Sequence, residues 1–464
     1  MKKFLAVVLT LAITLSLAAC GGAGTQAPAP SEPAAPAPAQ PEAPASAADG
    51  LAYTGDLTVM HFSTFEESQG NGGSDGFRTV NQQWDDAYPN INLVQDVMAN
   101  DEYKNVIAAR AAAGDMPDVF LLQGMNTGTW ANQGLILDLT DIIKSSPYAD
   151  TYDMSKLFPF HADGRDYAFP VLTEGSCTMV IYDKQMWSEA GFGEFPGTWD
   201  EVITANEHFS GAGIDTIAFG NSGKWQANSC FITSVGNRFT GHDWFYSMVD
   251  KSGAAFTDQP FVDALKYMQD IFQSGVFNRD FNAINNEDAR ELYIAGKAAS
   301  FIGGNWDTSY VYATLLEGDP AKLDNTYLAV IPQPAGATAT TATHATGMGY
   351  GIAINANLSG DKLDAAIDYA RYVTGPEFAK FVAENYALSA FSQVSGVDLS
   401  KFDRFTQDFY KFYENEGCEI YDSYLTGEVW DVFNTDLQNL LNGQGTPEQM
   451  AANAQAAYES SYLS

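Results

Sequence analysis

The sequence predicts an α/β fold. Short runs of β-branched and apolar residues alternate with stretches of helical periodicity, and this alternation starts afresh after residues 167–170. Strand–helix–strand units of this length favour a parallel sheet with right-handed crossovers. The composition agrees, because 45% of residues are apolar and 13% are aromatic, which is enough for sizeable cores.

In the first half, strands are predicted at residues 57–62, 91–94 and 119–122. The third is a continuous apolar run, as in a parallel strand buried on both faces. Between the strands we predict a helix at 77–87 and a second helix that starts with Asp101 as its N-cap. Gly114, followed by Pro117, is expected to end the second helix.

The second half repeats the alternation. Thr198 with Glu201 three residues later predicts a capping box at a helix start, and residues 363–373 predict an amphipathic helix stopped by Gly375. Thr374 and Glu377 are expected to cap a further helix, and the tail from Phe405 to be helical. The predicted strands are 178–182, 217–219, 299–302, 327–331 and 350–354. No short-period repeat is present, which disfavours solenoids and propellers.

The charge of the chain excludes one class of function. Its 464 residues include 58 Asp and Glu against 23 Lys and Arg, a formal net charge of −35. Such a chain is repelled by phosphate backbones and by anionic lipid headgroups. We therefore expect no nucleic-acid partner.

The N-terminus reads as a targeting segment. Lys2 and Lys3 precede an apolar run at 4–19 that is too short for a comfortable membrane span. The run ends in Leu17-Ala-Ala-Cys20 and resembles a bacterial lipoprotein signal with its lipobox. That resemblance implies a signal peptide at 1–19 and a lipidated Cys20 that anchors the chain to a membrane. Residues 20–50, with seven prolines, are then a disordered Ala/Pro-rich linker.

Neither a metal site nor a cofactor is predicted. Cys177, Cys230 and Cys418 match no zinc spacing, and the sequence favours buried free thiols while allowing one disulfide. The five histidines are scattered. Asp280, Asn282 and Glu291 partly match a calcium loop, but Ile284 and Asn285 stand where an oxygen ligand and Gly are required.

Nine segments line up with one family. In order they are Trp84-x₃-Tyr-Pro-Asn-Ile91, Asp101-Glu-Tyr-Lys104, Ala113-Gly-Asp-Met-Pro-Asp-Val119, Gly134-Leu-Ile-Leu-Asp-Leu-Thr-Asp141, Asp163-Gly-Arg-Asp-Tyr-Ala-Phe-Pro170, Ile181-Tyr-Asp-Lys184, Pro196-x-Thr-Trp-Asp-Glu201, Ala295-Gly-Lys-Ala-Ala299 and Ile302-Gly-Gly-Asn-Trp306. From about Leu57 to the C-terminus the chain resembles the extracellular solute-binding proteins of family 1. These are sugar-binding receptors of ATP-driven (ABC) importers, including the maltose-binding type.

The resemblance implies a two-lobed periplasmic-binding-protein-like fold of type II. Each lobe is a sheet flanked by helices, with a hinge and an interlobe cleft. Lobe one would span 51–170 and 347–392, and lobe two 173–345 and 394–464. The hinges would lie near 170–173, 345–347 and 391–394. We expect a monomer that sits on the extracellular face of the bacterial cell membrane.

A sugar ligand requires flat aromatic rings for its C–H faces and planar polar groups for its hydroxyls. Trp306, flanked by Asn305 and Asp307, and Trp225 are the main stacking candidates. Trp84, Trp187 and Trp199 fit helical faces and are expected to be structural. The remaining candidate ligand-binding residues are Phe65, Glu66, Gln123, Asn126, Glu174 and Tyr350.

The leading hypothesis is a lipid-anchored receptor that captures a carbohydrate, an oligosaccharide in particular, and delivers it to ABC transporter permease subunits. No nucleophile elbow, Walker loop or His-Glu-x-x-His motif is present, so no catalytic residue is predicted. The alternative is a surface-anchored glycan-degrading hydrolase or lyase, which would need two carboxyl groups about 5–10 Å apart. A third reading is a sensor that closes on its ligand to signal rather than to import.

Overall fold

The computed structural model describes residues 50–65, 72–152, 159–170, 175–249, 251–338, 344–375, 378, 400, 402–412, 415, 417–425 and 427–461. The signal, the linker and the helix expected after Thr374 therefore lie outside the described residues, apart from Gly50 and the isolated Phe378.

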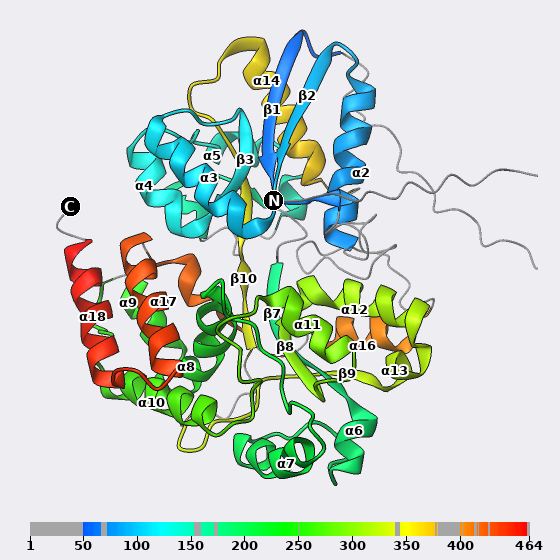
Figure 1. Ribbon diagram of the computed structural model, residues 1–464. Coiled ribbons are helices and arrows are strands. Elements are labelled where there is room, and N and C mark those ends of the chain that lie inside the picture. Colours follow the sequence, from blue (N-terminus) through cyan, green and yellow to red (C-terminus); the bar gives the residue numbers. More distant parts are fainter. Residues whose placement is uncertain are drawn as a thin grey trace, which may run out of the picture. The chain divides into compact units, whose positions relative to one another are not determined.

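The first sheet has five strands in the order β2-β1-β3-β11-β6. Figure 1 labels β1, β2 and β3 of this sheet. Parallel pairs join β1 to both β2 and β3, whereas β11 runs antiparallel to β3 and to β6. Every residue of β11 and the first four of β3 are buried, as expected for central strands. The strands are β1 (Gly55–His61), β2 (Ile91–Val97), β3 (Val119–Gln123), β6 (Phe169–Pro170) and β11 (Tyr350–Ile354).

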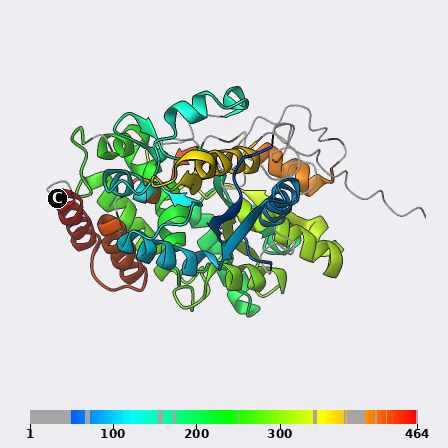
Figure 2. The same cartoon turned by 90° about the horizontal axis from the view of Figure 1, so that it is seen from above.

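Helices α2 and α14 pack together against this sheet, and Figure 2 shows them from above. The Trp84 indole meets the Tyr369 ring edge-on at 5.4 Å and donates a hydrogen bond to Asp368 Oδ2 at 2.9 Å. The Tyr369 hydroxyl donates to Asn81. The elements of this first lobe are α2 (Gly72–Ala87), α3 (Asn100–Ala113), η2 (Gly124–Asn126), α4 (Thr127–Asn132), α5 (Thr140–Lys144), η3 (Ala149–Thr151), the hairpin β4 (His161–Ala162) and β5 (Arg165–Asp166), and α14 (Gly360–Val373).

Asp118 ties three elements of the first lobe together. Its carboxylate accepts hydrogen bonds from the Thr58 amide and hydroxyl on β1 at 2.8 and 2.9 Å. The same carboxylate pairs with Lys362 of α14 at 2.8 Å. The Ala113–Val119 motif thus has a structural role at the start of β3.

The second sheet is built around β7, which pairs with β10, β8 and β9. Alternate residues of β7 face opposite sides: Met179 and Ile181 join one buried cluster, while Val180 and Tyr182 join the other. Both faces are therefore covered. The strands are β7 (Gly175–Asp183), β8 (Ser300–Gly304), β9 (Thr326–Ala329), β10 (His344–Met348) and β12 (Gly417–Glu419).

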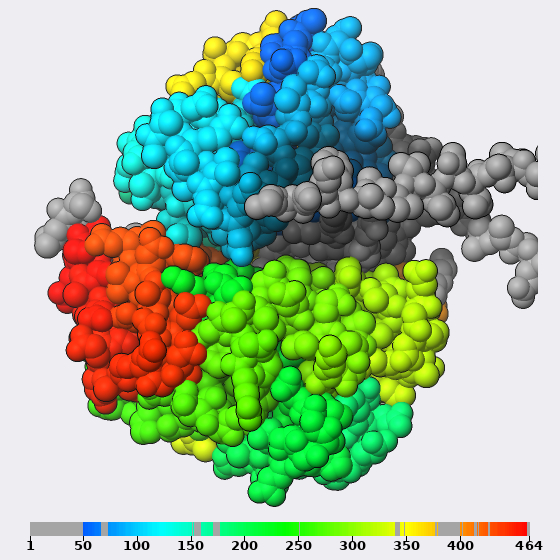
Figure 3. Space-filling view, viewed as in Figure 1, coloured from blue at the N-terminus to red at the C-terminus, as the bar shows by residue number. Residues whose placement is uncertain are grey.

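Helices surround the second sheet to form the second lobe, and the C-terminal helices α17 and α18 form part of the surface in Figure 3 (red). They are α6 (Lys184–Glu189), α7 (Trp199–Gly211), the π-helix η5 (Gln226–Ile232), α8 (Thr233–Thr240), α9 (His242–Val249), α10 (Gln259–Gln273), α11 (Asn286–Ile294), α12 (Asn305–Gly318), α13 (Pro320–Asn325), α16 (Arg404–Phe412), η7 (Tyr421–Ser423), α17 (Gly427–Leu441) and α18 (Pro447–Ser460).

The chain changes sheet between β10 and β11. Residues up to Met348 pair with β7 in the second sheet, and residues from Tyr350 pair with β3 in the first. Gly349 alone separates the two strands, so this crossing lies two residues beyond the 345–347 segment expected from the sequence.

Most predicted elements are present. The capping box of Thr198 and Glu201 starts α7, and Gly114 ends α3 in the left-handed conformation with φ +69°. Two predictions are wrong. Ala99, not Asp101, is the N-cap of α3, because the helix starts two residues earlier than predicted and Asp101 falls in its first turn.

The strand predicted at 217–219 does not form a ladder. Ile217 and Ala218 make only isolated bridges, to Phe277 and Phe301. The Phe219 amide donates to the Asn278 side chain at 2.8 Å instead of to a neighbouring strand, which ends the pairing. The short strands β10 and β12 were not predicted.

The three cysteines of the folded part are buried free thiols, as the sequence favoured. Trp84, Trp187 and Trp199 are fully buried, which confirms their structural role. Among the described residues, none of the helices combines the length and hydropathy that a membrane crossing requires.

His61 makes the fold sensitive to acid. The fully buried ring accepts a hydrogen bond from the Ser63 amide at Nδ1 and bonds Gln95 through Nε2, and burial lowers its pKa to about 4. Because the unfolded chain takes up this proton near pH 6.5, stability should fall as the pH drops from 6.5 to 4. The loss is at most about 3 kcal/mol, at 1.36 kcal/mol per pKa unit. Urea unfolding of residues 50–464 across this range measures the loss. His61→Gln should flatten the profile relative to a His161→Gln variant, because the His161 side chain is 43% exposed.

Candidate functional site

The first lobe presents polar groups at the carboxyl end of β3. Gln123, the last residue of β3, pairs in register with Tyr350, the first residue of β11. The Tyr350 hydroxyl accepts a hydrogen bond from Asn100 Nδ2 at 3.3 Å, at the start of α3. The Tyr350 ring is buried between Phe62 and Tyr103, at centroid distances of 4.8 and 6.3 Å. Gln123 is partly exposed at this edge of the sheet. Tyr350 is buried and packs against the residues that form the edge.

The first turns of α3 carry the contact to the second lobe. Lys104 Nζ lies 5.6 Å from the centroid of the Trp225 ring, within cation–π range. Asp101, which pairs with Lys104 at 3.3 Å, lies so close to Gly223 that a Cβ there would be 3.1 Å from its carboxylate. A cation and a carboxylate of one lobe thus meet an aromatic ring of the other.

Trp225 is positioned by an irregular segment. Lys224, directly before it, has φ +66°, a conformation that is uncommon for a residue with a side chain, and its Nζ is held by Thr435 Oγ1 at 3.1 Å. Directly after Trp225 the chain enters the π-helix η5, whose seven residues are all buried. Strained backbone and single π-helical turns are both frequent at functional sites.

Trp306 lies beside Trp225. The two ring centroids are 5.6 Å apart at an interplanar angle of 67°, so the indoles form an open corner. Trp306 occupies the first turn of α12 and folds back over Gly304, where a Cβ would lie 2.3 Å from the ring. The buried Trp306 Nε1 has no acceptor among the described residues, which leaves this donor for a ligand or water.

Asn305 and Asp307, predicted to contact the ligand, are buried and bonded to other protein groups. Asn305 Oδ1 accepts from the Cys177 amide at 2.8 Å. Asp307 accepts from Asn286 at 2.8 Å and from the Gly304 amide at 3.1 Å, and it pairs with Arg290 at 3.2 Å. Burial raises the Asp307 pKa to about 6, and Arg290 opposes this shift. The arrangement makes both residues supports that hold the α12 turn and hence Trp306.

The structure adds three residues that the sequence analysis missed. Asp422, in η7, accepts a hydrogen bond from Ser229 Oγ of η5 and another from the indole of Trp430 in α17. Burial raises the Asp422 pKa, while Ser229 and the positive charge of Lys104 oppose the shift. Asp422 therefore lies within electrostatic range of the lysine that contacts Trp225. Trp430, in an amphipathic C-terminal helix, was the one sequence feature that could have pointed to this part of the site. Packing in the core explains a tryptophan at that position equally well.

The other predicted residues are not brought into this group by any contact described here. Phe65 is 58% exposed and lies 5.5 Å from the Arg78 guanidinium. Asn126 is partly exposed at the end of η2. Glu66, Glu174 and Cys20 lie outside the described residues.

The resulting group pairs apolar flat surfaces with charged and polar groups. Trp225, Trp306 and Trp430 supply rings, Asp422 and Asp101 supply acceptors, and Lys104 supplies donors. The described residues include no cluster of His, Cys, Asp or Glu arranged to hold a metal ion. Binding of a polar molecule with apolar faces is the chemistry that this group fits best.

Comparison with known families agrees with this geometry. Residues 71–380 match the model of the bacterial extracellular solute-binding protein family, which is more than half of the chain. The chain belongs to this family. It is therefore a binding protein and not an enzyme, and it acts outside the cytoplasm.

Curated relatives match part of the chain. A "Probable sugar-binding periplasmic protein" of Brucella suis is 28% identical over 209 residues, which cover 44% of this chain and 47% of the relative. The "Diacetylchitobiose binding protein DasA" of Streptomyces coelicolor is 25% identical over 214 residues, covering 43% of this chain and 44% of that protein. The chain thus spans about half the length of the curated relatives it matches.

Solved structures establish the two-lobed fold over most of the chain. A "Chitin oligosaccharide binding protein" superposes with a TM-score of 0.77 at 21% identity, covering 89% of this chain and all of that one. A maltose-bound MalE3 from T. maritima superposes with a TM-score of 0.70 at 20% identity, with 89% and 100% coverage.

Gly124 of the first lobe packs closely against Ser423 of the second lobe. A Cβ at this position would lie 2.7 Å from the Ser423 carbonyl oxygen of η7 and 2.5 Å from Pro159 Cβ. Gly124→Ala should therefore push η7 away from the first lobe and displace the neighbouring Asp422.

We expect Gly124→Ala to weaken ligand affinity at least tenfold in calorimetric titration. The matched control is Gly128→Ala, because a Cβ at Gly128 meets nothing within 4 Å. Equal affinity of the two variants would contradict the proposed close contact.

Proposed function

We propose that this protein is the carbohydrate receptor of an ABC importer, with an oligosaccharide as its ligand. The observation that carries the proposal is the corner formed by Trp225 and Trp306, with Asp422 and Lys104 beside it. Indole rings stack on the C–H faces of a sugar, and carboxylate and ammonium groups bond its hydroxyls. Family membership and the sugar-related names of both curated relatives and structural neighbours support the same ligand class.

The mechanism we propose is lobe closure. Lys104 and Asp101 belong to the first lobe, whereas Trp225, Trp306 and Asp422 belong to the second. A sugar that touches both sets stabilises the closed arrangement over the open one by its differential affinity. The closed receptor, acting as a monomer, would then present the sugar to the permease subunits.

Trp306→Ala tests the ligand class. Loss of a stacking ring should weaken binding of the best neutral oligosaccharide on a glycan panel by at least tenfold, as measured by calorimetry. Leu316→Ala serves as the control, because Leu316 lies on the same helix and is 51% exposed. Tight binding of a non-carbohydrate solute, with no sugar bound by the native chain, would refute the assignment.

Cys20 is proposed to carry the lipid anchor, with the linker up to residue 50 as its tether. Cys20→Ala should abolish labelling by a clickable palmitate analogue and release the protein into the medium of a Gram-positive host. A Ser31→Ala variant in the linker is the control and should remain in the membrane fraction. Retention of the Cys20→Ala protein in that fraction would contradict the anchor.

A further inference from the structure

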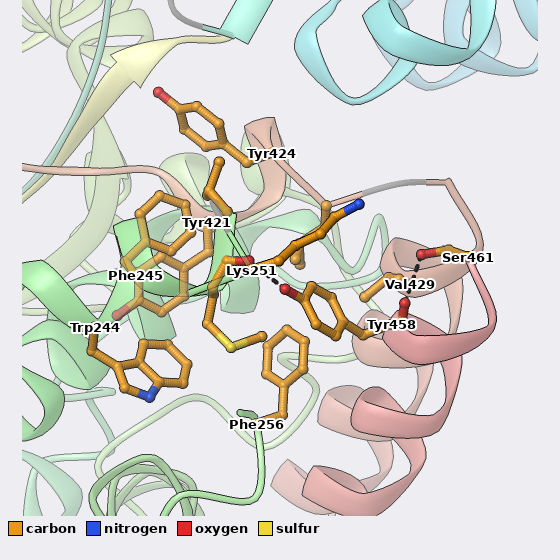
Figure 4. Close-up of a pocket in the computed structure, with 12 residues that line it drawn as sticks. Trp244, Phe245, Lys251, Phe256, Tyr421, Tyr424, Val429, Tyr458 and Ser461 are labelled. Carbon is orange, nitrogen blue, oxygen red and sulfur yellow. Dashed lines mark hydrogen bonds between the residues drawn. The ribbon is translucent and has the colours of Figure 1, made fainter. Parts of the chain in front are cut away.

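The second lobe contains a cavity of about 130 Å³ (Figure 4). None of the residues that line it belongs to the group around Trp225. Helices α9, α17 and α18 and the turn η7 form its walls. Six apolar and aromatic side chains dominate the lining: Trp244, Phe245, Met248, Phe256, Tyr421 and Val429.

Stacked rings make these walls rigid. Phe245 and Tyr421 lie face to face, with centroids 4.6 Å apart and an interplanar angle of 14°. Trp244 stacks in the same way on Phe261, at 4.8 Å and 13°. Phe256 meets the Tyr458 ring edge-on at 5.7 Å. Rings held by one another cannot readily collapse into the space, so the cavity persists in the folded protein.

Two polar groups of these walls are bonded elsewhere, whereas the buried Tyr421 hydroxyl has no hydrogen-bond partner among the described residues. Trp244 Nε1 donates to Asp258 Oδ2 at 2.9 Å, and the Tyr458 hydroxyl donates to the Met248 carbonyl oxygen. The Tyr421 hydroxyl lies on the far side, 3.3 Å from where a Cβ of Gly236 would be. A cavity holds water well only where several polar groups converge on it, and an apolar cavity of about 150 Å³ instead takes up benzene.

We propose that this cavity is a binding site for a single small uncharged aromatic ring, between benzene and indole in size. Its volume fits one ring, and its walls offer both faces and edges of other rings, which aromatic ligands prefer. Lys251 is the one charged side chain among the residues described as lining the cavity, so a cationic ligand would lose its hydration and meet a like charge.

The cavity is connected to the proposed sugar site through η7. Tyr421 lines the cavity, the next residue, Asp422, accepts a hydrogen bond from Ser229, and Ser423 abuts Gly124. A ring bound behind Tyr421 should therefore change sugar affinity, and sugar should change ring affinity by the same factor. This linkage rests on the proposed function, whereas binding of the ring does not.

The test titrates the mature chain, without sugar, with benzene and indole, using ligand-observed NMR and thermal unfolding. Saturable binding and a higher midpoint temperature are expected from the native protein. Val429→Phe fills the cavity and should weaken binding at least tenfold. Val432→Phe, on the same helix but lining a different surface groove, should bind like the native chain.

A second variant enlarges the cavity, because Val429→Phe could lose binding simply by failing to fold. Met248→Ala should admit a three-ring probe such as carbazole, which the native cavity is too small to hold. The proposal would be overturned if the native chain bound neither benzene nor indole. It would also be overturned if the native protein and Val429→Phe bound these probes equally well.

Discussion

The pairing of two consecutive strands with different sheets is the constraint on which the remaining structure depends. β10 is held by β7 and β12, β11 is held by β3 and β6, and a single glycine separates them. A strand cannot slip by one residue without reversing which side chains face the core. The register of this crossing therefore places Tyr350 and Gln123 at one edge of the first sheet and orients the second sheet, from whose end Trp306 emerges.

A buried ion pair between Asp307 and Arg290 lies next to Trp306 of α12. Asp307 is completely buried and Arg290 nearly so, and removing either partner would leave an uncompensated charge in the core. The geometry that results is specific: the carboxylate caps α12, Gly303 and Gly304 leave room for it and for the indole, and Trp306 is fixed against Trp225. A residue whose charge and position suggested ligand contact thus acts by positioning its neighbour.

Among the described residues, close contacts join the two lobes around α3, η2 and η7. Lys104 lies over Trp225 and interacts with Asp422, and Gly124 leaves no space for a side chain against Ser423. Charged groups from both lobes at one place favour a ligand that can bond each of them. Tyr421 of η7 lines the aromatic cavity, and Ser423 of η7 contacts Gly124. A ligand in the cavity that moved η7 would therefore change the contact between the lobes.

The sequence by itself determined the α/β class, most strands and helices, the buried free cysteines and the structural tryptophans, because these follow from local periodicity and capping. It also singled out Trp225 and Trp306 as stacking candidates, because polar and glycine neighbours surround them, and the structure places the two rings side by side. Tertiary structure alone decided the rest. Segment 217–219 lost its ladder to a side chain of Asn278, Asp307 was drawn inward by Arg290, and Asp422, Ser229 and Trp430 converge from three elements far apart in the chain. Such contacts depend on which distant groups meet after folding, and local sequence patterns do not specify those long-range pairings.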